Sequence, residues 1–237
     1  MLSHSMRLLV GALITAMPLA ANAATISFGP TPYLQHGDTP DGFACDQCVL
    51  TIEDFEDNSL DPFLTIDNGD ILEPNSMSGL MNSVTDSVDG DDGSVDGNGN
   101  GGHSWFTGSD SEADRELTIT FSETVKAAGL VFTDGDSSSA NIRLEAFDEG
   151  GESLGVIDAG DLVDHVFTGE TEEDRFLGFQ NSYGAIKSIT LSMDAGIGIE
   201  VDHIHWQALS SCVPEPASLG MVLFGMLGLP ALRRRRR

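Results

Sequence analysis

Basic side chains are scarce in this chain, which has 11 Lys and Arg against 38 Asp and Glu. Six of the eleven lie at the two ends, as Arg7 and the final run of arginines, so only five remain between them. A surface so rich in negative charge repels phosphate backbones and anionic lipid, and it attracts divalent cations. The composition therefore excludes a nucleic-acid-binding protein, while most of the acids need no role beyond solubility.

Motifs of the common enzyme classes are also scarce. The sequence contains neither an H-E-x-x-H zinc motif nor a glycine-rich phosphate loop. Carboxylates are so abundant that finding two able to face each other across a glycosidic bond carries no information. We therefore expect the protein not to be an enzyme, and a carbohydrate-active enzyme is kept as an alternative.

Helical periodicity is missing between the two ends. Alternating or β-branched runs recur instead, and clusters of Asp and Gly such as 134–136 and 148–151 separate them. Many short strands at this spacing predict an all-β fold, an antiparallel β-sandwich of jelly-roll type, in one acidic domain over 24–212. The runs cover 49–55, 63–66, 116–121, 128–133, 141–147, 154–157, 175–179, 186–193 and 199–206.

The first 23 residues have the features of a secretion signal. Arg7 precedes an apolar run from Leu8 to Ala16, which is short for a membrane span, and Ala21-Asn22-Ala23 supplies a small-residue cleavage site. We therefore expect a signal helix over 1–23 and a mature chain that starts near Ala24.

The last 25 residues, 213–237, combine a short motif, an apolar segment and a basic end. Sixteen uncharged residues over 217–232 reach about 24 Å as a helix, which is less than the ~30 Å hydrocarbon core. The basic end orients this short transmembrane helix with the main domain outside. An ordinary C-terminal anchor is the alternative to a removable tail. The motif residues are Pro214, Glu215 and Pro216, and the basic end is Arg233, Arg234, Arg235, Arg236 and Arg237.

This order of features resembles the PEP-CTERM sorting signal, whose tail is also labelled an ice-binding protein C-terminal motif. The resemblance implies a protein of a Gram-negative cell that is held transiently at the inner membrane, processed by an exosortase, and released to the cell surface or extracellular matrix. Segments that include 86–104, 147–148, 174–176 and 200–203 look like a PEP-CTERM-associated β-sandwich family over roughly residues 50 to 207. Members of that family are described by their tail, so the likeness implies a fold and no activity.

Residues 83–104 are dominated by Asp, Asn and Gly. Asp96-x-Asn98-x-Asn100-Gly101 reproduces the first half of an EF-hand-type loop, but its twelfth position is Thr107 rather than Glu. Without a cation, repulsion between the acids of this segment opposes an ordered fold. We predict that the segment binds Ca²⁺, and a disordered acidic linker is the alternative. The candidate ligands are Asp86, Asp89, Asp91, Asp92, Asp96, Asn98 and Asn100.

Two further groups of polar residues are candidates for metal binding. Glu56 and Asp202 form a second candidate calcium site between the first and last strands, by analogy with jelly-roll binding modules. His203-x-His205 places two imidazoles on one strand face, at a spacing that a transition-metal site uses. The alternative for the two histidines is a pair of partly exposed strand residues.

The sequence has three cysteines. Cys45 and Cys48 have the spacing of a redox motif, but no βαβ unit surrounds them. We predict a local disulfide between Cys45 and Cys48, which leaves Cys212 free, competing for a partner, or joining two chains.

These features predict an exported surface or matrix protein that acts as a non-catalytic binding module. Exopolysaccharide is the expected ligand and calcium the expected stabilising ion. The first alternative is a structural matrix or envelope component without a specific ligand, and the second is a carbohydrate-active enzyme.

Overall fold

A computed structural model describes residues 24–46, 48–74, 85–108, 111–135, 139–163, 166, 169–196 and 198–212. The predicted signal over 1–23 and the predicted sorting segment over 213–237 lie outside these residues. Across the described ranges, no helix has the length and apolar character that crossing a membrane requires.

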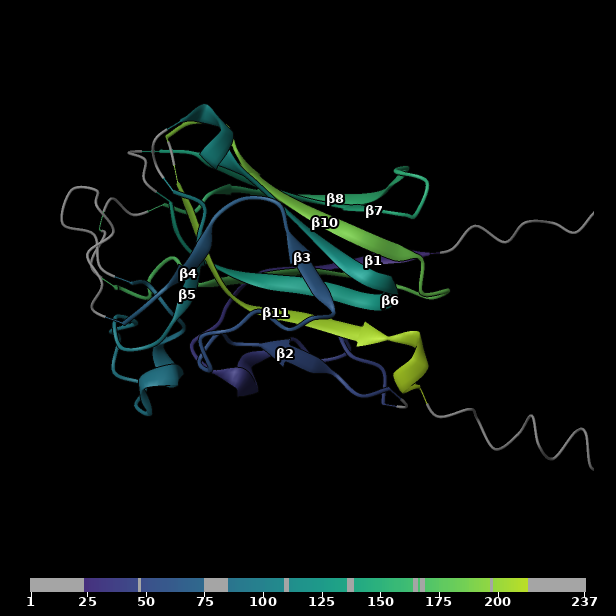
Figure 1. The fold of residues 1–237 in the computed structure, drawn as a ribbon, viewed down its shortest axis with the longest axis horizontal. Helices are drawn as coiled ribbons and strands as arrows, with labels where there is room; N and C mark the ends of the chain where they lie inside the picture. The colour runs from purple at the N-terminus through teal and green to yellow at the C-terminus, as the bar shows by residue number, and fades with distance from the viewer. Residues whose placement is uncertain are drawn as a thin grey trace, which may run out of the picture.

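The described chain is all-β and antiparallel, as predicted (Figure 1). Its helical elements within the described ranges are single 3₁₀ turns, namely η1 (His36–Asp38), η2 (Asp89–Asp92), η3 (Glu112–Arg115) and η4 (Leu209–Ser211). The strands are β1 (Thr25–Pro32), β2 (Thr51–Glu53), β3 (Leu64–Ile66), β4 (Asp70–Leu72), β5 (Ser104–Phe106), β6 (Glu116–Gly135), β7 (Asn141–Phe147), β8 (Ser153–Asp161), β9 (Arg175–Asn181), β10 (Ile186–Met193) and β11 (Ile199–Ala208).

The long strand β6 belongs to two sets of strands. Its first part pairs with β3 and β10, and β10 continues through β7 to β8. Its second part pairs with β11 and β9, and these carry β2, β5 and β1. The sequence predicted two separate strands over 116–121 and 128–133, whereas the structure runs them together into one strand of 20 residues.

The burial of β6 changes where its partners change. Inward-facing Leu117, Ile119 and Phe121 alternate with less buried residues in the first part, and from Ala127 to Gly135 every residue is buried. Leu130 and Phe132 of this second part belong to the main core. Ala127 and Val131, which alternate with them, belong to a second, smaller core. That core is made of Tyr33, Phe43, Val88, Ala127, Val131 and Phe176.

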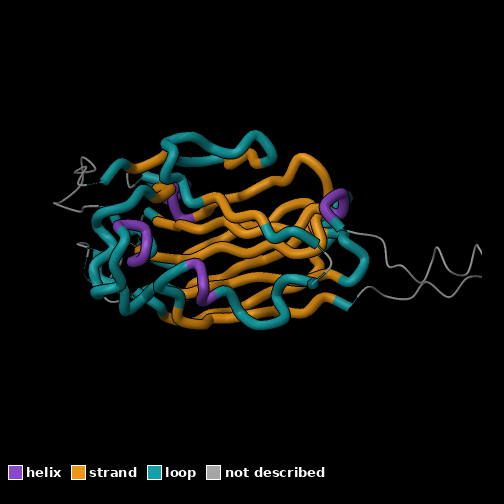
Figure 2. Tube along the Cα trace, turned by 90° about the horizontal axis from the view of Figure 1, so that it is seen from below, coloured by secondary structure: helices purple, strands orange, loops and turns teal. Residues whose placement is uncertain are grey.

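Different elements lie at the two ends of the domain. The start of β1 and the end of η4 lie at the same end of the domain (Figure 1). At the opposite end lie η2 and its flanking loop, beside β4 and β5 (Figure 1). Figure 2 shows the strands running side by side between these two ends. The Asp-rich segment is therefore placed far from both ends of the described chain.

Candidate cation-binding site

The Asp-rich segment folds back onto β11, the strand with Glu200 and Asp202. The backbone N–H of Asp86 donates to Oε1 of Glu200 at 2.7 Å, and the N–H of Val88 donates to Oδ2 of Asp202 at 2.8 Å. Ser104 donates its hydroxyl to the same Glu200 oxygen. Glu200 and Asp202 thus accept hydrogen bonds from backbone N–H groups of the loop that are not paired with a strand.

Two aspartates brought to this place have buried oxygens without hydrogen bonds. Asp86 and Asp174 are both fully buried, and neither carboxylate has a hydrogen-bond partner among the described residues. Asp174 precedes β9, so it comes from a different part of the chain. Removing an ionised carboxylate from water destabilises the fold by several kcal/mol unless a proton, a hydrogen-bond donor or a cation compensates the charge.

Neighbouring acids add to the electrostatic cost. Burial raises the pKa of Asp86 well above its usual value, and the charges of Asp174 and Glu200 raise it further. Burial likewise raises the pKa of Asp174, and the charge of Asp89 adds to the increase. Burial raises the pKa of Glu200 to about 8, with a further contribution from Asp134. We call Asp86, Asp134, Glu173, Asp174 and Glu200 the buried acid cluster.

This cluster has the chemistry of a hard-cation site. Ca²⁺ takes six to eight oxygen ligands, mainly from carboxylates, carbonyls and water. The cluster supplies carboxylate oxygens at a buried position where uncompensated charge is costly. Only Asp86 of its five members is among the ligands predicted from the sequence.

Asp89, one of the predicted calcium ligands, holds the backbone of its own loop. Its carboxylate accepts backbone N–H groups from Asp96 at 3.1 Å, Gly97 at 2.8 Å and Asn98 at 3.3 Å. This buried side chain therefore holds the loop in a closed turn. Other predicted ligands lie on the outside of the turn: Asp92, Asp96 and Asn98 are exposed, and Asn100 is half-buried. Calcium binding by these four residues stays a prediction.

The structure gives Glu56 and Asp202 different partners. Glu56 accepts the backbone N–H of His103 and lies 3.3 Å from Nδ1 of the same residue. Asp202 lies with Asp91 and His203, and one metal-binding atom from each of these three residues falls within 4.8 Å of the others. Asp202 thus lies in a group with Asp91 of the other predicted calcium site, while calcium binding by Glu56 and Asp202 stays a prediction.

The two histidines of β11 are buried rather than partly exposed. Nε2 of His203 lies 3.1 and 3.0 Å from the two carboxylate oxygens of Asp91, and its Nδ1 lies 2.9 Å from the hydroxyl of Tyr33. His205 lies 3.2 Å from the same hydroxyl through its Nε2. Burial lowers the pKa of His205 to about 3, so this imidazole is neutral at physiological pH.

A surface cavity of about 270 Å³ lies beside this group. Asp91 belongs both to the cavity wall and to the histidine group, so the cavity borders the group at this residue. The lining residues are Gln35, His36, Gly37, Gly90, Asp91, Gly93, Ser94 and Val95.

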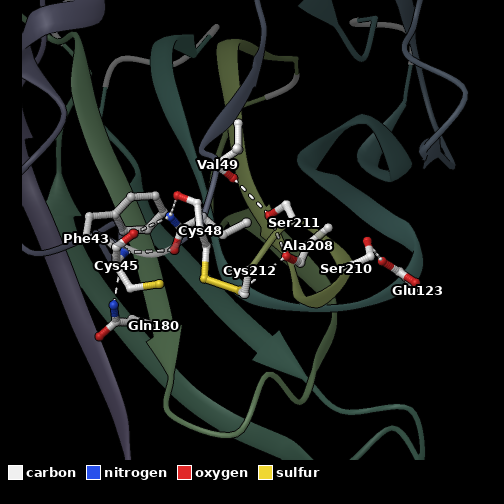
Figure 3. The surroundings of a disulfide bond; sticks show 11 residues. Phe43, Cys45, Cys48, Val49, Glu123, Gln180, Ala208, Ser210, Ser211 and Cys212 are labelled. Atoms are coloured by element: carbon white, nitrogen blue, oxygen red, sulfur yellow. Dashed lines mark hydrogen bonds between the residues drawn. A yellow bond between two sulfur atoms is a disulfide. The ribbon is translucent and has the colours of Figure 1, made fainter. Parts of the chain in front are cut away.

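The cysteine prediction is corrected by the structure. Cys48 forms its disulfide with Cys212, and Cys45 is free (Figure 3). The reason is the folded geometry: Cys48 and Cys212 form an isolated antiparallel bridge, which no spacing in the sequence reveals. Gln207 of β11 fixes this region, since its side chain bonds the backbone of both Cys45 and Cys48.

One enzyme-like pattern is present at Gly151-Glu-Ser-Leu-Gly155, which matches G-x-S-x-G. The nucleophile elbow of hydrolases places its serine on a sharp turn between a strand and a helix. Ser153 instead begins β8 in the hairpin that follows β7, and it is exposed. This pattern therefore gives no support to a hydrolase.

Comparisons with known proteins assign no family to this chain. No family model matches the sequence, and no curated protein is similar to it. Among solved structures, it is similar to a family 89 glycoside hydrolase from Clostridium perfringens in complex with 2-acetamido-1,2-dideoxynojirmycin, with 8% identity and a TM-score of 0.32. That likeness covers 65% of this chain and only 15% of the hydrolase.

Proposed function

We propose that this chain is an exported, non-catalytic binding protein in which Ca²⁺ fixes the Asp-rich segment onto β11. The observation that carries the calcium proposal is the pair Asp86 and Asp174, fully buried with carboxylate oxygens that have no hydrogen bond in the described chain. A dication compensates several carboxylates at once, whereas each proton compensates one.

The proposal explains why so many acids are buried next to a loop that has little apolar content. Val88 is the one residue of 85–103 in an apolar core, where it meets Tyr33 and Phe176. The remaining contacts of the loop are polar, through Glu200, Asp202 and Asp89. A cation bound among Asp86, Asp174 and Glu200 adds attraction where the carboxylates otherwise repel each other.

Exopolysaccharide is the proposed ligand, and the end of the domain that carries the loop is its proposed binding surface. The cavity beside η2 is lined by glycines, which leave backbone N–H and C=O groups accessible, and by polar side chains such as Gln35, His36 and Ser94. These groups suit hydroxyl-bearing ligands. The alternation of β6 between two sets of strands supports a sandwich of jelly-roll type beneath this surface.

The export proposal rests on the two ends of the sequence. A cleavable signal over 1–23 and a PEP-CTERM tail over 213–237 carry the chain across the inner membrane, anchor it there briefly, and deliver it to an exosortase. The strands and the two apolar cores that the structure describes lie within 24–212 and would remain in the processed chain.

Thermal unfolding of residues 24–212 in EDTA and in Ca²⁺ tests the calcium proposal. A ligand at one hundred times its Kd adds about 2.7 kcal/mol, and for a domain of about 190 residues this corresponds to a rise of roughly 5 to 10 °C in Tm. The double variant D86N/D174N should lose this rise. The matched variant D92N, changed at an exposed acid of the same loop, should keep it.

Either of two results would count against the proposal. Equal Tm values in EDTA and Ca²⁺ would remove the ion, and a response lost in D92N but kept in D86N/D174N would move it to the outer turn. Retention on native exopolysaccharide columns tests the ligand separately. Absence of retention in Ca²⁺, together with self-association in the absence of sugar, would favour the structural matrix component.

A further inference from the structure

Asp91, Asp202 and His203 form a compact group of potential metal ligands at the surface side of β11. One nitrogen or oxygen atom from each residue lies within 4.8 Å of the other two. Asp202 and His203 are buried, and the Asp91 side chain is 13% exposed. The group combines imidazole with carboxylate, which differs from the all-oxygen buried acid cluster.

The backbone of β11 is distorted so that two consecutive residues reach the same partner. In a regular strand, residues 202 and 203 point to opposite faces. Here the pairing of β11 with β6 shifts register between Asp202 and His205, and His203 has a positive φ of 42°. A non-glycine residue with positive φ is conformationally costly and is often found at functional sites. This bulge lets both Asp202 and His203 approach Asp91.

Hydroxyl and imidazole groups pack behind the His203 ring. His205 Nδ1 lies 2.6 Å from the carbonyl oxygen of His203 and must donate to it, because a carbonyl only accepts. Nε2 of His205 lies 3.2 Å from the hydroxyl of Tyr33 and 3.2 Å from that of Thr39. The Tyr33 hydroxyl also lies 2.9 Å from Nδ1 of His203, so a hydrogen bond holds this ring nitrogen in place.

The other ring nitrogen of His203 faces a carboxylate. Nε2 lies 3.0 and 3.1 Å from the two oxygens of Asp91. At this distance either a proton or a cation bridges a ring nitrogen and a carboxylate, so a metal ion that replaces the proton would bind both groups. Metal-ligating histidines commonly have their second nitrogen hydrogen-bonded, as Nδ1 of His203 is to the Tyr33 hydroxyl.

We propose that Asp91, Asp202 and His203 form a transition-metal site, best suited to Zn²⁺, with Nε2 of His203 and one oxygen from each aspartate as ligands. Imidazole and carboxylate together suit zinc better than calcium, which prefers oxygen alone. Three protein ligands leave a fourth position for water or a ligand group. The cavity lined by Asp91 and His36 borders the group at Asp91. This site is separate from the proposed calcium site and does not depend on it.

Zn²⁺ titration of residues 24–212 by calorimetry tests the site, after metal removal and with millimolar Ca²⁺ present to fill sites that prefer calcium. We expect one tight Zn²⁺ site per chain, weakened at least tenfold in H203Q and in D91N. The matched control is H103Q, which changes a histidine that pairs with Glu56 instead. It should bind Zn²⁺ as the unchanged chain does.

A spectroscopic readout keeps the test decisive if a variant fails to fold. In the unchanged chain labelled with ¹⁵N-histidine, Zn²⁺ should shift the Nε2 resonance of His203 and leave its Nδ1–H intact. The proposal is overturned if Zn²⁺ leaves that resonance unmoved, if H103Q weakens binding as much as H203Q does, or if excess Ca²⁺ displaces the bound Zn²⁺.

Discussion

Replacing Glu200 by Gln should change how the stability of the metal-free domain depends on pH. Glu200 is almost fully buried, and its pKa is raised from 4.5 to about 8, mainly by burial. The folded state therefore holds a proton over a pH range in which the unfolded state has released it. Stability from this group is complete below pH 4.5 and is lost as pH rises through 8.

The size of the effect follows from the two pKa values. One unit of difference corresponds to about 1.36 kcal/mol. Linkage between 4.5 and about 8 predicts that Glu200 costs the metal-free domain roughly 3 to 4 kcal/mol between pH 5 and pH 8. Gln keeps an acceptor oxygen for the N–H of Asp86 and the hydroxyl of Ser104, and it does not titrate.

Urea unfolding of residues 24–212 in EDTA at pH 5 and pH 8 measures this difference. E200Q should lose less stability than the unchanged chain between the two pH values, by about the amount above. E149Q makes the same change at an exposed position in the turn between β7 and β8 and should behave as the unchanged chain does. An equal loss in E200Q and the unchanged chain would refute the assignment of a buried, protonated Glu200.

Three other substitutions, two of them with a matched control variant, test other parts of the structure. C48S should destabilise the domain by up to about 5 kcal/mol in urea unfolding, because it opens a bridge between residues 164 apart, whereas C45S should leave both stability and the bridged peptide unchanged in a non-reducing digest. Y33F should cost about 1–3 kcal/mol in the same assay, because it leaves buried nitrogens of His203 and His205 without the hydroxyl, and an unchanged midpoint would contradict a stabilising role for these two contacts. G99A should loosen the Asp-rich loop, since a Cβ there would lie 2.0 Å from the carbonyl oxygen of Ser87. Faster amide exchange of Ser87 and Val88 is the measurement. G37A in η1, where a Cβ meets no atom within 4 Å and φ is not positive, is the matched control and should leave those amides unchanged.

Strand positions were largely predictable because they depend on local alternation. β7 and β10 match the predicted ranges, and β9 and β11 are longer than predicted by two residues each. β1, β4 and β5 were missed. β1 contains Gly29-Pro30 and ends at Pro32, which disguise it. β4 and β5 have three residues each and, unlike β2 and β3, do not lie within predicted alternating or β-branched runs.

The candidate sites were less predictable because their residues meet only in the folded chain. Asp174 approaches Asp86 from the start of β9, and Tyr33 reaches His203 from the end of β1. One local signal was available: Glu200 and Asp202 stand between Ile199, Val201 and Ile204, in a strand apolar enough to be buried on both faces. Acids in such a strand must be neutralised by something.

The covalent bridge between Cys48 and Cys212 also sets how the domain bears mechanical load. A force applied to the chain beyond residue 212 acts first on Cys212, and the disulfide transmits it to Cys48, which lies 164 residues earlier in the chain. Without that bond, the same pull would act on the end of β11 and unzip it from β6 one hydrogen bond at a time. With it, tension bypasses the strand that carries Glu200, Asp202 and His203, so these side chains stay in register when the chain beyond residue 212 is pulled.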